Sequence, residues 1–198
     1  MTELWEHNDV HTAVKILYVH GYLGSGNGHS SELLHQEFTS RGIPCILDAP
    51  DFPVTRPKEM RTMIKKLVEE KGYDCIVASS LGAFYSMQIP IIKKILVNIA
   101  LPENLMQIRA SDPEHNQGLS DEFFSEVNRE KDVFFSEVFD KEFRQQSYVV
   151  YGIRDRIAPN EGFLKRYYND ESRISHVDME HKLDEKGARK VFEIIKQV

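Results

Sequence analysis

At its centre the chain reads DCIVASSLGA, residues 74–83. The apolar first half is typical of a buried strand, and the small residues after it predict a sharp turn into a helix. A serine at such a turn needs small residues two positions before and after it, because backbones approach closely there. Ser80 meets this need with Ala78 and Gly82, whereas the preceding serine has bulkier neighbours. Ser80 is therefore a candidate nucleophile, and the N–H of Leu81 lies where a helix N-terminus stabilises a developing oxyanion.

Upstream, a strand candidate at residues 14–19 ends in His20-Gly21-Tyr22. The glycine lets the backbone swing so that the N–H of Tyr22 can act as a second oxyanion donor beside that of Leu81. His20 itself is interpreted as structural. The two N–H groups form the candidate oxyanion hole.

Downstream, two strand candidates are each followed by a titratable residue. Asp155 comes after the strand at 148–151, and His181 comes after the strand at 174–177. A nucleophilic serine needs a base and an orienting acid, which in α/β folds come in the order Ser, Asp, His after later strands. We therefore predict Ser80 as nucleophile, His181 as general base and Asp155 as the acid that orients it.

Four other residues compete for these roles. Glu103 follows the strand candidate at 95–100 and is an alternative acid, while His176 lies inside the last strand. Asp48 and Asp51 follow the second strand and are interpreted as turn residues.

Along the whole chain, apolar runs alternate with helical patterns. The strand candidates are residues 14–19, 43–47, 75–78, 95–100, 148–151 and 174–177. The helix candidates are residues 31–41, 58–71 and 184–197. Continuous apolar strands separated by helices predict a mostly parallel sheet covered on both faces, which is a three-layer α/β/α sandwich.

The length of 198 residues suits a single domain at about 150 residues per domain. One segment, 102–146, is longer than a simple crossover and predicts a helical cap insertion. Within it the pentapeptide FFSEV occurs at 123–127 and at 134–138, an offset of nearly three helical turns. The offset places four residues on one helical face: Phe123, Val127, Phe134 and Val138. We interpret this face as a stripe packed on the sheet, with a pocket for an apolar substrate group as the alternative.

Composition excludes several classes. The net charge is −6 without a basic stripe, which argues against a nucleic-acid partner, and residues 121–144 carry eight acids and four bases. Cys45 and Cys75 lie in separate apolar runs, so we expect buried strand thiols rather than a disulfide framework or a zinc site. The N-terminus lacks a signal-peptide pattern and no apolar run is long enough to span a membrane, so we expect a cytoplasmic protein.

The His20-Gly21-Tyr22 loop, the turn at Ser80 and the late Asp155 and His181 resemble an α/β-hydrolase, and are most similar to the small bacterial YqiA-like esterases. The similarity covers about residues 14–198 and is poorest in the insertion. It implies a serine hydrolase that cleaves esters or thioesters through the triad, with no cofactor and no metal. Ala78 stands where glycine is commoner. The substrate and the oligomeric state stay open.

Two other interpretations remain at this point. Gly24–Gly28 follows a strand and precedes a helix, with Asp48 about 20 residues downstream, as in a nucleotide-binding α/β module. Its spacing lacks the third small residue of the dinucleotide fingerprint. The third interpretation is a catalytically inactive hydrolase-like scaffold whose interaction surface is the acidic segment 121–144.

Overall fold

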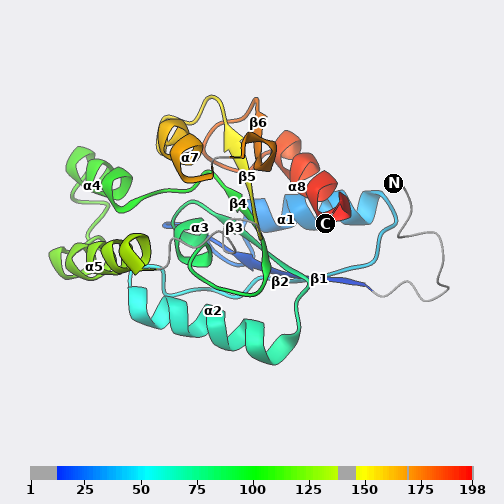
Figure 1. The fold of residues 1–198 in the computed structure, drawn as a ribbon, viewed down its shortest axis with the longest axis horizontal. Coiled ribbons are helices and arrows are strands. Elements are labelled where there is room, and N and C mark those ends of the chain that lie inside the picture. The colour runs from blue at the N-terminus through cyan, green and yellow to red at the C-terminus, as the bar shows by residue number, and fades with distance from the viewer. Residues whose placement is uncertain (1–12, 138–145, 169, 198) are drawn as a thin grey trace.

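The computed structural model describes residues 13–137, 146–168 and 170–197, in which six strands form one sheet (Figure 1). They are β1 (Val14–Val19), β2 (Cys45–Asp48), β3 (Cys75–Ser79), β4 (Lys93–Val97), β5 (Ser147–Gly152) and β6 (Ile174–Val177). Their order across the sheet is β2-β1-β3-β4-β5-β6, and every neighbouring pair is parallel. The carboxyl ends of the strands therefore share one edge of the sheet, where ligands bind in open α/β sheets.

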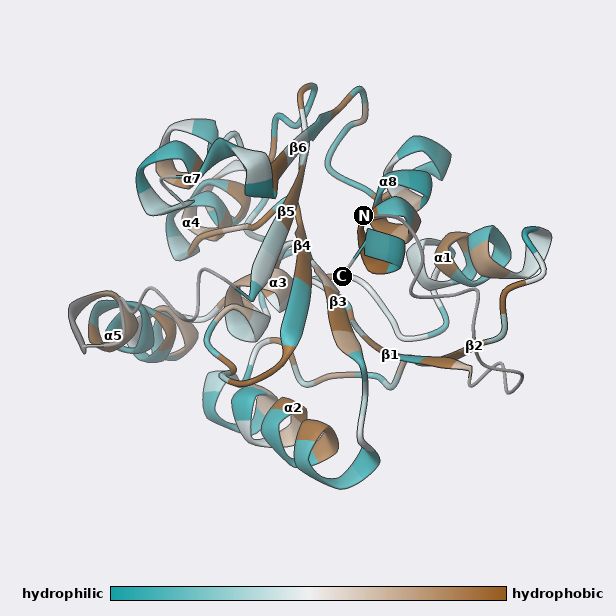
Figure 2. Cartoon of the chain, turned by 45° about the vertical axis from the view of Figure 1, so that its right-hand side comes forward, coloured by the Kyte–Doolittle hydropathy of each residue, from teal (hydrophilic) through white to brown (hydrophobic). Residues whose placement is uncertain are grey.

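Helices cover both faces of this sheet. They are α1 (His29–Ser40), α2 (Pro57–Lys71), α3 (Leu81–Ser86), α4 (Pro102–Ser111), α5 (Asp121–Glu137), α7 (Glu161–Tyr168) and α8 (Glu185–Gln197), with a 3₁₀ turn at Glu171–Arg173. Figure 2 shows α1 and α8 side by side on one face and the remaining helices on the other. The three-layer sandwich predicted from the sequence is confirmed.

Each face of the sheet has its own hydrophobic core. In β1 the adjacent Ile16 and Leu17 are both fully buried, Ile16 in the core beneath α1 and α8 and Leu17 in the core beneath α2 and α3. Successive side chains of a strand point to opposite faces, so a strand covered on both sides is apolar at every position. This is why the buried strands appear in the sequence as continuous apolar runs.

The helix ends follow the predicted signals. Pro57 is the first residue of α2, where its missing N–H costs nothing, and the helix stops at Gly72 in the left-handed region with φ of 62°. Gly42, just after α1, has φ of 66°. These two glycines account for the accuracy of the predicted ends of α1 and α2.

Two strands differ from their predicted bounds by two residues or more at one end. β4 was expected at 95–100 but begins at Lys93 and ends at Val97, because Asn98 turns the chain out of the sheet with φ of 47°. β2 was expected at 43–47 and is instead the short edge strand Cys45–Asp48. Cys45 is consequently only half-buried, which corrects the expectation of a buried thiol.

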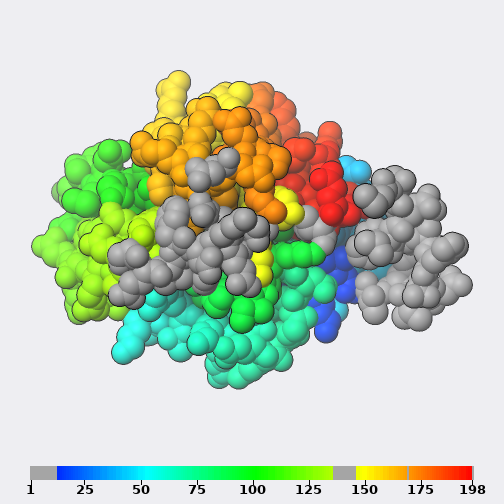
Figure 3. Space-filling model, in the orientation of Figure 1, coloured from blue at the N-terminus to red at the C-terminus, as the bar shows by residue number. Residues whose placement is uncertain are grey.

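The predicted insertion contains α4 and α5, which pack on each other between β4 and β5 in the chain. In the space-filling view they form the left-hand end of the molecule, between α2 below and α7 above (Figure 3). Phe123, Val127 and Phe134 of α5 are all buried, at 2%, 0% and 4% exposure, within the core on that side of the sheet. They therefore form the packed stripe that we expected; Val138 lies outside the described residues.

The acidic character of this insertion is partly neutralised. Glu130 is buried and paired with Arg61 of α2 at 3.2 Å, and Arg109 of α4 pairs with Asp121 of α5 at 2.5 Å. Glu130 therefore holds α5 against α2 instead of contributing to an acidic surface.

The helices that the structure describes are too short or too polar for a membrane-spanning segment.

Candidate active site

Ser80 lies at the turn between β3 and α3, with φ of 54° and ψ of −124°. A non-glycine residue at positive φ is strained and is stabilised here by tight packing of the backbone around it. A Cβ atom at Gly82 would lie only 2.3 Å from the carbonyl oxygen of His20, and one at Gly21 would lie 2.7 Å from Cβ of Ser80. Ala78, the small residue two positions before the serine, is fully buried.

A continuous chain of hydrogen bonds joins the three residues predicted as a triad. Nε2 of His181 lies 2.9 Å from Oγ of Ser80, and Nδ1 of His181 lies 2.8 Å from Oδ2 of Asp155. Ser80 follows β3, Asp155 follows β5 and His181 follows β6, so the parallel sheet brings them to one edge from positions up to 101 residues apart.

Asp155 is held as an ionised carboxylate. Its side chain is fully buried, and Oδ1 accepts hydrogen bonds from the N–H groups of Ile157 at 2.8 Å and Ala158 at 3.0 Å. Burial raises the pKa of Asp155, but the hydrogen bonds from His181 and from the two N–H groups outweigh burial and lower the pKa below its usual value. The ionised acid accepts a hydrogen bond from the N–H at Nδ1 of His181, which leaves Nε2 without a proton and facing the hydroxyl of Ser80.

The predicted oxyanion donors belong to two segments next to the serine: Leu81 follows it in the chain, and Tyr22 follows Gly21, which packs against Ser80. Leu81 is the first residue of α3, and Tyr22 follows the buried His20-Gly21 pair. In the part of the chain that the structure describes, neither N–H donates a hydrogen bond. Nε2 of His20 accepts the N–H of Phe52 at 2.9 Å, so its Nδ1 carries the proton and donates it to the carbonyl of Gly21 at 2.9 Å. His20 thus holds the Tyr22 loop in place, as its structural interpretation requires.

The competing residues lie elsewhere. His176 is exposed and lies 3.1 Å from Oε1 of Glu161, and Glu103 pairs with Lys131. Asp48 accepts a hydrogen bond from the hydroxyl of Tyr73, and Asp51 accepts one from the N–H of Gly26 at 2.7 Å. None of these three carboxylates and one imidazole has a hydrogen bond to Ser80 or His181.

The same contacts argue against a nucleotide site in the glycine-rich loop. The N–H of Gly26 already binds Asp51, where a phosphate would need a free donor. A Cβ at Gly26 would lie 1.9 Å from the carbonyl oxygen of Ala49, so this glycine serves close packing between two loops. Gly26 therefore has a structural explanation.

Asn98 is a residue of this site that no sequence motif indicated. It is fully buried just beyond β4, and its side chain bonds to the backbone of both Gly152 and His181. The one available signal was a polar residue inside the apolar run 95–100, which we had assigned to the strand interior. A Cβ at Gly152 would lie 2.7 Å from the carbonyl oxygen of Glu180. Glycine at this position therefore lets the loop that carries His181 approach the end of β5.

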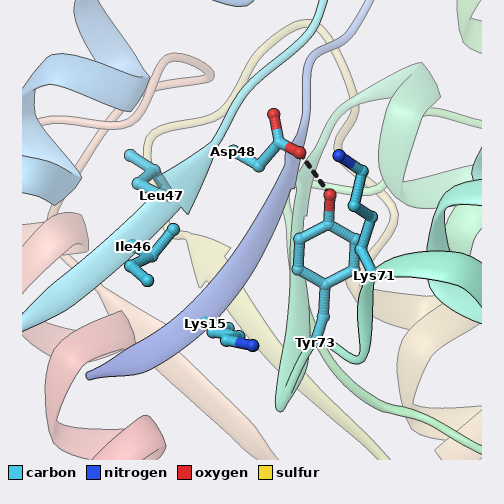
Figure 4. Close-up of a pocket in the computed structure, with 6 residues that line it drawn as sticks. All are labelled: Lys15, Ile46, Leu47, Asp48, Lys71 and Tyr73. Atoms are coloured by element: carbon cyan, nitrogen blue, oxygen red, sulfur yellow. Dashed lines mark hydrogen bonds between the residues drawn. The ribbon is translucent and has the colours of Figure 1, made fainter. Parts of the chain in front are cut away.

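Two surface pockets lie away from the triad. The larger, of about 320 Å³, opens beside β1 and β2 and is lined by Lys15, Ile46, Leu47, Asp48, Lys71 and Tyr73. Figure 4 shows the hydroxyl of Tyr73 pointing to the carboxylate of Asp48, to which it donates a hydrogen bond. The other pocket, of about 270 Å³, lies between β6 and α8. Within residues 13–137, 146–168 and 170–197, no group of three or more His, Cys, Asp or Glu side chains is arranged to hold a metal ion.

Comparison with known proteins defines the family and the fold. The family described as "Uncharacterised protein family (UPF0227)" matches residues 15–196, which confirms the family resemblance drawn from the sequence. No curated protein matches the chain.

Three solved structures illustrate the fold. An alpha/beta hydrolase from Novosphingobium aromaticivorans matches with a TM-score of 0.61 and 14% identity, over 94% of this chain and 90% of that one. The ydeN gene product from B. subtilis has a TM-score of 0.60 and 16% identity, over 93% and 98%. Est1E from Butyrivibrio proteoclasticus has a TM-score of 0.59 and 16% identity, over 96% and 88%. The chain therefore has the α/β-hydrolase fold.

Proposed function

The chain belongs to the UPF0227 family and has the α/β-hydrolase fold, and from this premise we propose that it is a serine hydrolase that cleaves carboxylic esters. The proposal rests on one observation, the hydrogen-bond chain from Ser80 through His181 to Asp155. A fold by itself does not fix an activity, whereas a nucleophile bonded to a base that is bonded to an acid has a defined chemistry. The family and the fold neighbours support a hydrolase in general terms.

In the acylation step, Oγ of Ser80 attacks the carbonyl carbon of the ester while Nε2 of His181 takes the hydroxyl proton. The carbonyl oxygen becomes an oxyanion, which we assign to the N–H groups of Tyr22 and Leu81. The bond to the alcohol oxygen then breaks, and His181 returns its proton to the leaving alcohol. The acyl group remains on Ser80.

Deacylation repeats the same proton transfers with water. His181 removes a proton from a water molecule that attacks the acyl carbonyl, and the acid is released as Oγ of Ser80 regains its proton. Asp155 keeps its charge throughout, and its buried carboxylate stabilises the imidazolium that forms in each step.

We assign substrate selection to the insertion at 102–146, acting as a cap on a single catalytic domain. A contact at the loop between α4 and α5 supports this assignment. A Cβ at Gly118 of that loop would lie 3.6 Å from Oη of Tyr22 and 3.4 Å from Cγ2 of Thr55. The insertion thus reaches the loop that carries a proposed oxyanion donor, so it borders the space in which an acyl group would lie.

A serine-reactive fluorophosphonate tests the proposal directly. We expect it to label wild-type protein and the Ser79→Ala variant but not Ser80→Ala, with hydrolysis of a short p-nitrophenyl ester following the same pattern. Ser79 is the matched control because it is the adjacent serine and its hydroxyl bonds to Tyr18 at 3.0 Å instead of to His181.

Full activity of Ser80→Ala would refute the proposed nucleophile. An unlabelled wild-type protein that NAD or ATP stabilises against heat would favour the nucleotide-binding interpretation, and one that neither labels nor binds nucleotide would favour the inactive scaffold. Parallel assays of an ester and a thioester with the same acyl group separate these two substrate classes. The cytoplasmic location remains a prediction from the sequence.

A further inference from the structure

The segment at which the chain leaves β4, residues 97–100, contacts all the segments that carry the triad. It contributes no triad residue itself. On the side of the serine, the N–H of Ser80 donates to the carbonyl of Val97 at 2.9 Å, and the N–H of Ala100 donates to the carbonyl of Ser80 at 3.2 Å. These two bonds fix the strained turn to the end of β4.

The same segment also holds the loop that carries the acid. The N–H of Gly152 donates to Oδ1 of Asn98 at 2.7 Å, and the N–H of Asn98 donates to the carbonyl of Val150 at 3.0 Å. Further along the acid loop, Nδ2 of Asn160 donates to the carbonyl of Ile99 at 2.7 Å. Both ends of the loop around Asp155 are therefore tied to the exit of β4.

The third set of bonds reaches the base. Nδ2 of Asn98 donates to the carbonyls of Glu180 at 2.9 Å and His181 at 2.8 Å. The side chain of Asn98 is fully buried, so water cannot replace these bonds. A buried carbonyl or amide left without a partner destabilises the fold, so this arrangement is preferred over one in which these groups are unpaired.

We propose that Asn98 is a positioning residue that sets the place of His181 between Ser80 and Asp155. This rests on the proposed function. His181 belongs to the loop between β6 and α8, and its ring must meet two partners at 2.8 Å and 2.9 Å at once. A hydrogen bond to its own carbonyl fixes the backbone from which the ring extends. Asn98 connects that backbone to the end of β4, the strand that pairs with β3, and it does so from a left-handed backbone conformation with φ of 47°.

The substitution Asn98→Asp isolates this role. Aspartate has the same shape, tolerates the left-handed backbone, and keeps an oxygen for the N–H of Gly152. It replaces the NH₂ group with a second oxygen that faces the carbonyls of Glu180 and His181. Asn98→Gly is the second variant, because glycine accepts the backbone conformation but removes every side-chain bond.

We expect both variants to lose about 100-fold in kcat with KM changed by no more than about threefold, since a misplacement of about 1 Å in a reacting group has a cost of that size. The rate of fluorophosphonate labelling should fall in parallel. Ile95→Ala is the matched control, because Ile95 is fully buried in β4, three residues before Asn98, and its loss destabilises the fold without touching the triad. Its kcat should stay within about twofold at a temperature where it is folded.

An NMR measurement gives a readout that does not depend on turnover. We expect the ring nitrogen resonances of His181 to move in Asn98→Asp and Asn98→Gly and to stay in place in Ile95→Ala. Unchanged kcat or unchanged His181 resonances in folded Asn98 variants would overturn the positioning role while the proposed function stands. A wild-type protein that neither labels nor hydrolyses esters would refute the proposed function, and the His181 resonances would still test the positioning contact.

Discussion

At Asp155, burial and hydrogen bonding have opposite effects on one carboxyl group. Burial raises its pKa, and the bonds from His181, Ala158 and Ile157 lower it further than burial raises it. A carboxyl group whose pKa is depressed by folding stabilises the fold above its unfolded pKa of about 3.9, and this stabilisation is lost as the pH falls through the lower folded value. Asp155 therefore stays ionised in the neutral range, where the proposed reaction needs it.

The first prediction concerns this charge. Asp155→Asn keeps the shape and the acceptor for the two backbone N–H groups, but its amide donates to Nδ1 of His181 and so puts the proton on Nε2. Nε2 of His181 then already carries a proton and cannot take the one on Ser80. We therefore expect kcat to fall by about 10⁴-fold, as in other triads. Asp178→Asn, an exposed aspartate paired with Arg154 and Lys186, is the control and should keep near wild-type kcat. A loss below tenfold in Asp155→Asn would contradict the assignment.

At the scale of an element, β4 contains a buried lysine that lowers the stability of the fold. Lys94 is fully buried, and in the described residues its ammonium donates one hydrogen bond, to the carbonyl of Ile92 at 2.8 Å. Burial lowers the pKa of Lys94 to about 8. A lysine whose folded pKa lies below its unfolded value destabilises the fold whenever it is protonated, because the unfolded chain binds that proton more tightly.

The second prediction follows from the sign of this shift. The contribution of Lys94 to the free energy of unfolding should rise between pH 8 and pH 10.5, by roughly 3 kcal/mol for a shift of this size. Lys94→Met should remove the rise and stabilise the protein near pH 7, as measured by urea unfolding at several pH values. Lys93→Met, at the exposed neighbouring position, is the control. The same slope in wild type and Lys94→Met would show that the buried amine is not its source.

At the scale of the molecule, the hydrophobic core beneath α1 and α8 and the proposed catalytic residues lie in different places on the sheet. Ser80, His181 and Asp155 lie at the carboxyl edge of the sheet, whereas Leu34 and Phe38 of α1 pack against α8 and one face of the sheet. The exit of β4, the turn at Ser80 and the two loops after β5 and β6 form a hydrogen-bonded unit at that edge. We call the core beneath α1 and α8 the far core. Substitutions deep inside it should therefore affect the free energy of unfolding more than turnover.

The third prediction tests this separation. Leu34 of α1 is fully buried in the far core, so Leu34→Ala should lower the free energy of unfolding by about 2–5 kcal/mol through the cavity it leaves. Below the melting temperature, kcat/KM and the rate of fluorophosphonate labelling should match the wild type. Leu34→Met nearly conserves volume and should cost less than about 1.5 kcal/mol. A kcat that falls in folded Leu34→Ala would show that the two cores are coupled.

Several features could be predicted because their causes are local. The turn at Ser80 was identified from small residues two positions away, and α2 from Pro57 and Gly72 at its ends. The apolar stripe of α5 followed from the helical offset of FFSEV. Other features had no local cause. β4 was placed too late because the charged Lys93 and Lys94 hide its start. Its end was also missed, because the N–H of Ala100 donates to the carbonyl of Ser80 instead of continuing the strand.

The sequence by itself determined which elements form and in what order, since strand burial, helix ends and the strained serine turn depend on residues within a few positions of one another. Strand order, and with it the meeting of Ser80, Asp155 and His181, was decided by the tertiary structure. So was the place of Asn98, whose three side-chain bonds reach 54, 82 and 83 residues along the chain. Those partners exist only after parallel pairing has brought the carboxyl ends of β3, β4, β5 and β6 to one edge, because no local pattern encodes which distant carbonyl a buried amide will find.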